Sequence, residues 1–143
     1  MEESLMLFNE DPADEAKASQ YSPLNLAYLG DAVFELYVRT MLVKRGNMPV
    51  NKHHRAAVKY VSSSAQAFMS EAVAPLLDEK EARIVKRGEN AKPHSISKNA
   101  DPVEHEKGTG FEALIGYLYL KGDEKRLAEI LDAAIRAAEE RQA

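Results

Sequence analysis

The chain has 143 residues, of which 45% are hydrophobic and 29% are charged, and it contains no Cys and no Trp. This length fits one compact domain that buries enough surface to fold without a disulfide or a metal staple. The lack of Cys excludes a disulfide framework, a thiolate zinc site, an iron–sulfur cluster and a Cys nucleophile. The acidic N-terminus is unlike a secretory signal, and no apolar run approaches the roughly 20 residues of a membrane span. We therefore expect a soluble, cytoplasmic protein with no membrane partner.

The formal net charge of −4 is distributed unevenly along the chain. Residues 39–98 carry 12 Lys and Arg against 5 Asp and Glu, a local net charge of +7, and the remaining residues sum to −11. Most asymmetries of this kind are solvated faces. A basic stretch of this length inside an acidic protein nevertheless keeps a nucleic-acid partner open.

The first strong structural signal is Ser22-Pro23, an N-cap residue followed by Pro at the first helical position. Residues 1–20 before it are acidic and weakly periodic, so we expect a flexible N-terminal arm followed by one domain over 21–143. The pair predicts a helix over 24–44, which Gly46 ends as a C-cap. Apolar side chains surround most of this helix, a pattern typical of a helix at the centre of a bundle or between subunits.

Helical spacing continues through the middle of the chain. Asp78 and Glu81 have capping-box spacing, Gly88 is expected to end the helix that they open, and Pro75 falls in the frayed last turn of the preceding helix. The pattern predicts three helices here, over residues 53–62, 65–77 and 79–87.

A polar stretch over residues 89–107 then predicts a long loop, and loops of this length are usually functional or disordered. An apolar helix over 109–121 follows, Gly122 stops it, and Asp123 caps a final amphipathic helix. No segment alternates with the period of a strand. The fold class is therefore expected to be all-α, with about six or more helices.

Two acids, Asp31 and Glu112, lie inside otherwise apolar helical segments, where acids are rarely buried unless they are paired. Each has a mid-helix glycine close by, Gly30 and Gly116, and such glycines allow close backbone approach to a helix or a ligand. One interpretation pairs each acid with a buried Arg or with a helix end. The other brings the two carboxylates together as ligands for Mg²⁺ or Mn²⁺, which bind carboxylates, water and phosphate oxygens.

Four motifs in order carry a family resemblance: residues 25–33 (Asn-Leu-Ala-Tyr-Leu-Gly-Asp-Ala-Val), 61–67 (Val-Ser-Ser-Ser-Ala-Gln-Ala), 86–92 followed by Lys98-Asn99, and 111–120. Together they resemble the ribonuclease III family, and most closely its short, mini form. The resemblance covers roughly residues 22–135.

This resemblance implies a ribonuclease III-type helical endonuclease domain that cleaves double-stranded RNA with Mg²⁺ and acts as a homodimer. The short form is associated with maturing large-subunit (23S) ribosomal RNA precursors. By motif position, Asp31 and Glu112 carry over as the catalytic and metal-binding acids, with Mn²⁺ able to substitute. Ala27 and Thr109 stand where larger relatives have a Glu and an Asp, so we expect one firmly held ion and a second that the RNA phosphate recruits.

The larger relatives also append a double-stranded-RNA-binding domain, for which the 22 residues after Lys121 are too few. We therefore expect the helical domain itself to bind the duplex through phosphates and 2′-hydroxyls. The best candidate RNA-binding residues are Lys86, Arg87, Asn90, Lys92 and Lys98. The alternative is that they belong to a solvated loop.

The apolar 24–43 helix is the expected interface of the homodimer, because a two-fold axis would match the approximate symmetry of duplex RNA. Two other interpretations stay open. The chain could be a catalytically silent RNA-binding or scaffold protein on the same fold, or Asp31 and Glu112 could be a buried electrostatic pair in a helical regulator.

Overall fold

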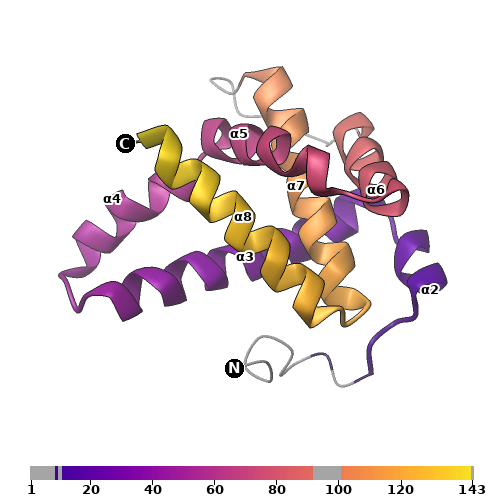
Figure 1. Ribbon diagram of the computed structural model, residues 1–143, viewed down its shortest axis with the longest axis horizontal. Helices are drawn as coiled ribbons and strands as arrows, with labels where there is room; N and C mark the ends of the chain where they lie inside the picture. Colours follow the sequence, from indigo (N-terminus) through magenta and orange to yellow (C-terminus); the bar gives the residue numbers. More distant parts are fainter. Residues whose placement is uncertain (1–8, 10, 92–100, 143) are drawn as a thin grey trace.

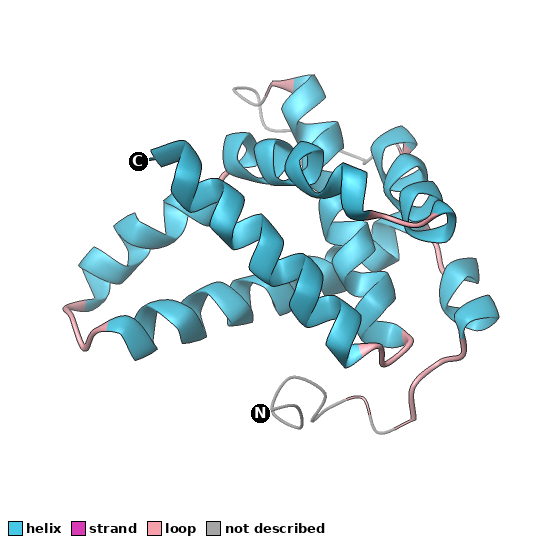
Figure 2. Cartoon of the chain, viewed as in Figure 1, coloured by secondary structure: helices cyan, strands magenta, loops and turns pink. Residues whose placement is uncertain are grey.

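The computed structural model describes residues 9, 11–91 and 101–142, and within these the chain is all-α, as predicted (Figures 1 and 2). None of the described helices is long and apolar enough to cross a membrane. The elements, in chain order, are α2 (Glu15–Gln20), α3 (Pro23–Arg45), α4 (Val50–Val61), α5 (Ser63–Val73), the 3₁₀ turn η1 (Ala74–Leu76), α6 (Glu79–Asn90), α7 (Pro102–Leu120) and α8 (Glu124–Gln142).

Helix α7 is the centre of the fold, and α3, α5 and α6 all pack extensively against it. Figure 1 shows α3 crossing behind α7, while α8 lies in front and packs on α5. The aromatic rings of Phe34 and Phe111, both fully buried, meet edge to face with centroids 5.3 Å apart where α3 and α7 pack. Burial of α7 over most of its circumference explains why its sequence is apolar on nearly every side.

The predicted N-caps Ser22 and Asp78 are confirmed. The Ser22 hydroxyl accepts a hydrogen bond from the Asn25 amide at 3.0 Å, so α3 begins at Pro23. Asp78 and Glu81 form the reciprocal capping box at the start of α6. The end predicted to fray at Pro75 is the 3₁₀ turn η1.

The prediction that Gly88 ends its helix is wrong, because α6 continues to Asn90. Gly88 lies inside the helix and faces α7, where a Cβ would stand 2.7 Å from the Cα of Gly110. Its missing side chain therefore serves close helix packing, and the local sequence pattern of a packing glycine is the same as that of a C-cap glycine.

The predicted loop over 89–107 is also too long at both ends. Helix α7 begins at Pro102, with Asp101 as an N-cap that accepts hydrogen bonds from the amides of Val103 and Glu104. Asp101-Pro102 repeats the cap-plus-proline signal of Ser22-Pro23, but the polar residues after it hid the start of the helix. Residues 92–100 lie outside the described part of the chain.

A short helix, α2, lies within the segment expected to be a flexible arm. Ala18 on α2 is fully buried, and the Ala13 amide donates to the Leu120 carbonyl at 2.9 Å. Six residues with one buried side chain carry too weak a periodicity to be recognised from sequence.

Helices α3 and α7 cross at backbone contact, and two glycines make this possible. A Cβ on Gly30 would clash with the backbone carbonyl of Glu112, and a Cβ on Gly116 would clash with that of Leu26. Each helix thus supplies a glycine where the other supplies a carbonyl. The expectation that these glycines allow close approach is confirmed, and what approaches is another helix.

We predict that Gly30→Ala destabilises the fold by about 3 kcal/mol or more, because the added methyl meets rigid backbone and cannot be absorbed by a rotamer change. Urea unfolding measures this loss. Gly46→Ala is the matched control, since a Cβ there meets nothing closer than the Met48 side chain at 3.7 Å. Equal stabilities for the two variants would contradict the role assigned to the crossing.

Candidate active site

The α3–α7 crossing brings Asp31 and Glu112 together. Asp31 follows Gly30 on α3, and Gly30 lies against the Glu112 backbone. The Glu112 carboxyl lies within hydrogen-bonding reach of the Asp31 carboxyl. The prediction that these acids, 81 residues apart in sequence, meet in space is therefore consistent with the described geometry.

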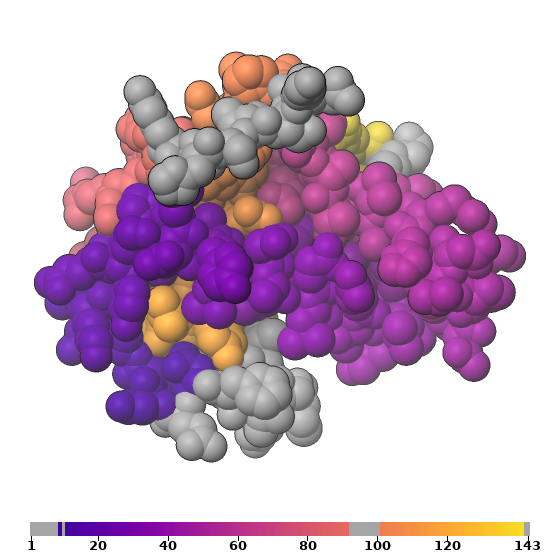
Figure 3. All heavy atoms as spheres, turned by 180° about the vertical axis from the view of Figure 1, so that it is seen from behind, coloured from indigo at the N-terminus to yellow at the C-terminus, as the bar shows by residue number. Residues whose placement is uncertain are grey.

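The two acids differ in exposure. Glu112 is half-buried, whereas Asp31 is exposed, so the inference that both acids are buried is wrong for Asp31. Asp31 shares the outer side of α3 with Tyr28, which is 84% exposed. Figure 3 shows the molecule from behind, with atoms of α3 running across the view and orange atoms of α7 visible beside them. An incoming phosphate group could therefore reach Asp31 directly.

Burial and the nearby Asp31 carboxyl raise the pKa of the Glu112 carboxyl to about 8. A more distant acid, Glu35, acts in the same direction, and a hydrogen bond from Gln66 opposes it. Both main causes disfavour a second negative charge at this place. A cation between the two carboxylates would remove that penalty.

The described residues do not supply this cation. Among the ion pairs formed within the described residues, none involves Asp31 or Glu112. The interpretation in which each acid pairs with a buried Arg is therefore not supported in this part of the chain.

The donor set suits a hard divalent cation. Two carboxylates supply oxygen ligands, and the exposure of Asp31 leaves room for water and phosphate oxygens to complete the shell. No cluster of three or more His, Asp or Glu side chains fit to hold a metal occurs within the described residues. The two positions where larger relatives carry further acids are buried here, Ala27 at 5% and Thr109 at 8% exposure. An ion at this site would thus depend on few protein ligands.

Sequence reasoning missed one polar residue at this site, Gln66 on α5. Its side-chain amide donates to Glu112 Oε2 at 3.2 Å and to the Val61 carbonyl at 3.4 Å. Gln66 is only 5% exposed and stands between the buried residues Ala65 and Ala67. A polar residue at a buried helix position was the available signal, but its partner on α7 could not be read from sequence.

The candidate RNA-binding residues fall into three groups: two are exposed on α6, one is hydrogen-bonded within the chain, and two lie outside the described residues. Lys86 and Asn90 are exposed and lie one turn apart on α6. Lys92 and Lys98 lie outside the described residues.

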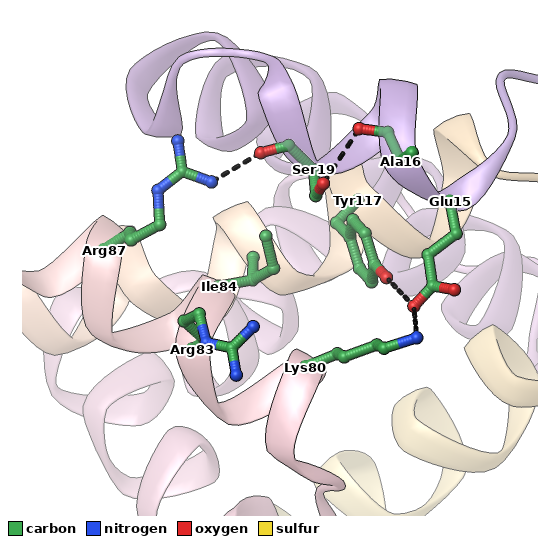
Figure 4. A pocket seen from close by; sticks show the side chains of 8 residues that line it. All are labelled: Glu15, Ala16, Ser19, Lys80, Arg83, Ile84, Arg87 and Tyr117. Carbon is green, nitrogen blue, oxygen red and sulfur yellow. Dashed lines mark hydrogen bonds and ion pairs between the residues drawn. The ribbon is translucent and has the colours of Figure 1, made fainter.

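The Arg87 side chain is hydrogen-bonded to the backbone of the same chain. Its guanidinium donates to the Ser19 carbonyl at 2.6 Å and to the Tyr21 carbonyl at 3.2 Å, just before α3 begins. Figure 4 shows it at one end of a groove of about 300 Å³ between α2 and α6, where Lys80 also pairs with Glu15 at 2.8 Å. Arg87 therefore helps to anchor the segment that leads into α3.

We predict that the metal-free protein loses stability as the pH rises from about 4.5 to about 8. In this interval an unfolded Glu112 is ionised while the folded one holds its proton, so folding becomes less favourable as the pH increases. Glu112→Gln removes this titration. The melting temperature of the wild type in chelator should therefore fall relative to that of the variant across this interval, whereas parallel curves would contradict the assignment.

Comparisons with known proteins agree with this arrangement. A family model described as the Ribonuclease III domain matches residues 24–123. A Mini-ribonuclease 3 of Symbiobacterium thermophilum is 53% identical over 112 residues, which cover 78% of this chain and 86% of that protein. A second Mini-ribonuclease 3, from a Thermoanaerobacter species, is 44% identical over 142 residues and covers 98% of this chain and 100% of its own length.

A solved structure supports the fold. The crystal structure of a Fusobacterium nucleatum protein superposes with a TM-score of 0.74 at 28% identity, covering 87% of this chain and 98% of that one. The family model spans the whole α3–α7 crossing with both acids, and the relatives match most of the chain. The chain therefore belongs to the ribonuclease III family, in its Mini-ribonuclease 3 branch.

Proposed function

We propose that this chain is an endoribonuclease that cleaves double-stranded RNA with the help of Mg²⁺ or Mn²⁺ held by Asp31 and Glu112. The observation that carries the proposal is the pair of facing carboxylates at the α3–α7 crossing, with no basic partner among the described residues. The family membership and the relatives named Mini-ribonuclease 3 support the same activity.

The two acids have different parts in this proposal. A divalent ion, when bound, lowers the pKa of a water and stabilises charge that develops on a phosphate. Asp31, on the exposed side of α3, binds the ion where an RNA strand can approach. Glu112, half-buried and hydrogen-bonded by Gln66, holds the ion from the core side.

Duplex RNA is proposed to contact the exposed face of α6 through Lys86 and Asn90, continuing to Lys92 and Lys98. Arg87 contributes indirectly, because its guanidinium holds the connection between α2 and α3. Contacts of this kind read phosphates and 2′-hydroxyls and carry little sequence information. On the family resemblance alone, we assign the ends of the 23S ribosomal RNA precursor, in the cytoplasm, as the natural substrate.

We predict that Asp31→Asn lowers the rate of duplex RNA cleavage at least about 100-fold, because the ion loses one of its two carboxylate ligands and several kcal/mol of charge stabilisation go with it. Cleavage by the wild type should require Mg²⁺ and stop with chelator. Asp132→Asn is the control, since Asp132 is exposed on α8 and pairs with Arg136 one turn away. A folded Asp31→Asn protein that cuts at the wild-type rate would refute the metal role.

The same assay distinguishes the nuclease from the main alternative function. A wild-type protein that binds duplex RNA but leaves it intact with Mg²⁺ or Mn²⁺ would identify a catalytically silent RNA-binding or scaffold protein on this fold.

The outer side of α3 supports a homodimer. Tyr28, Leu36 and Val43 are 84%, 50% and 58% exposed, and they recur at intervals of about two helical turns, so they share one side. Such a stripe on a helix that also carries Asp31 suits a two-fold interface that brings two sites around one axis.

We predict that Leu36→Glu converts a dimer of about twice 15.9 kDa into a monomer in light scattering coupled to size exclusion, because it places a charge inside an apolar interface. Val103→Glu, which changes an equally exposed residue (57%) on α7, should leave the dimer intact. If the wild type is already monomeric at micromolar concentration, the interface does not exist.

A further inference from the structure

Gln66 occupies a position that costs free energy unless its amide is hydrogen-bonded. It is 5% exposed on a helix face that also buries Ala65 and Met69. An amide moved from water into such surroundings without partners costs roughly 1–3 kcal/mol in proteins. Here the amide nitrogen has two acceptors, the Glu112 carboxylate and the Val61 carbonyl. These two bonds use both N–H groups of the amide nitrogen and fix the orientation of the amide.

The packing around Gln66 is arranged for the amide as well. Gly108 of α7 faces it, and a Cβ on Gly108 would stand 3.2 Å from Gln66 Oε1. The Gln66 side chain therefore fits against bare backbone of α7, one turn before Glu112. Helix α5 thus supplies the donor, Gln66, and helix α7 supplies the space for it at Gly108.

Orientation is the property that Gln66 can control. The last torsion of a Glu side chain is broad and sets where the two carboxylate oxygens point. A donor fixed on Oε2 restricts that torsion and leaves Oε1 free for another partner. Asp31 lies within hydrogen-bonding reach of the same carboxyl group.

The neutrality of Gln66 matters as much as its position. A Lys or Arg at this place would neutralise Glu112 and compete with a metal ion for it. An amide donates a hydrogen bond but leaves the full negative charge of the two carboxylates available to a divalent cation.

We propose that Gln66 is a positioning residue of the divalent-cation site, which holds one oxygen of Glu112 so that the other is presented together with Asp31. The inference rests on the metal site of the proposed function and adds a residue from a third helix, α5. Gln66 itself does not touch the substrate or the ion.

The test is Mn²⁺ binding without RNA, measured from the electron paramagnetic resonance signal of free Mn²⁺ during a titration of the intact protein. Gln66→Met keeps a side chain of similar length and removes the donor. Loss of such an outer-shell partner typically costs 10–100-fold in metal affinity, so the dissociation constant should rise by that factor. Ser70→Ala is the matched control, because Ser70 is equally buried (5%) one turn further along α5.

Cleavage kinetics provide a second readout. With Gln66→Met, kcat for duplex RNA at low Mn²⁺ should fall about 10-fold or more, excess Mn²⁺ should restore it, and KM for RNA should stay within about twofold. A purely structural role would lower kcat at every Mn²⁺ concentration, so excess ion would not restore it.

A second variant keeps the proposal falsifiable if Gln66→Met fails to fold. Gly108→Ala displaces the Gln66 amide by a few tenths of an ångström without removing it, and should weaken Mn²⁺ binding to a smaller degree. Wild-type Mn²⁺ affinity in the folded variant, or an equal loss in Ser70→Ala, would overturn the proposal. Weaker Mn²⁺ binding would support it even in a protein that leaves RNA uncut, so its failure and that of the nuclease function are distinguishable.

Discussion

Backbone contact between α3 and α7 is the constraint on which the rest of the structure depends. Gly30 and Gly116 each lie against a carbonyl of the opposite helix, so any side chain at either position would push the helices apart. The acids stand next to these contacts, Asp31 directly after Gly30 and Glu112 one turn before Gly116. The close packing of α3 and α7 therefore also brings the two carboxylates together. The edge-to-face pair of Phe34 and Phe111 supports it from the core side.

Acidic and basic side chains are concentrated at two separate sites, the α3–α7 crossing and the surface of α6. At the crossing, two carboxyl groups face one another without a basic partner in the described part of the chain, and burial together with the nearby Asp31 keeps the pKa of Glu112 high. On α6, positive and polar groups are presented to solvent, apart from Arg87, which anchors the backbone before α3. The net charge of −4 for the whole chain indicates neither the acidic crossing nor the basic surface of α6. The local arrangement is what suits a divalent ion on one side and a phosphate backbone on the other.

Sequence reasoning succeeded where a local rule determines the structure and failed where a tertiary contact does. Caps at Ser22 and Asp78 act within one turn, so they were predictable. Gly88 was misread because a packing glycine and a capping glycine differ only in what lies opposite, here Gly110. Asp31 was expected to be buried because its neighbours are apolar, yet that face of α3 is open in the single chain. Gln66 was part of a recognised motif, but its bond to Glu112 joins residues 46 positions apart and has no local signature.

We propose that the α3–α7 crossing builds a site for one divalent cation between Asp31 and Glu112. The most direct test is anomalous X-ray scattering from crystals of the protein soaked in Mn²⁺. We expect an anomalous peak within about 2.0–2.6 Å of carboxylate oxygens of both residues, the range of metal–oxygen bonds for hard cations. The peak should be lost in Asp31→Asn. A Mn²⁺ ion bound elsewhere in the chain, with neither carboxylate among its ligands, would show that the crossing is not the cation site.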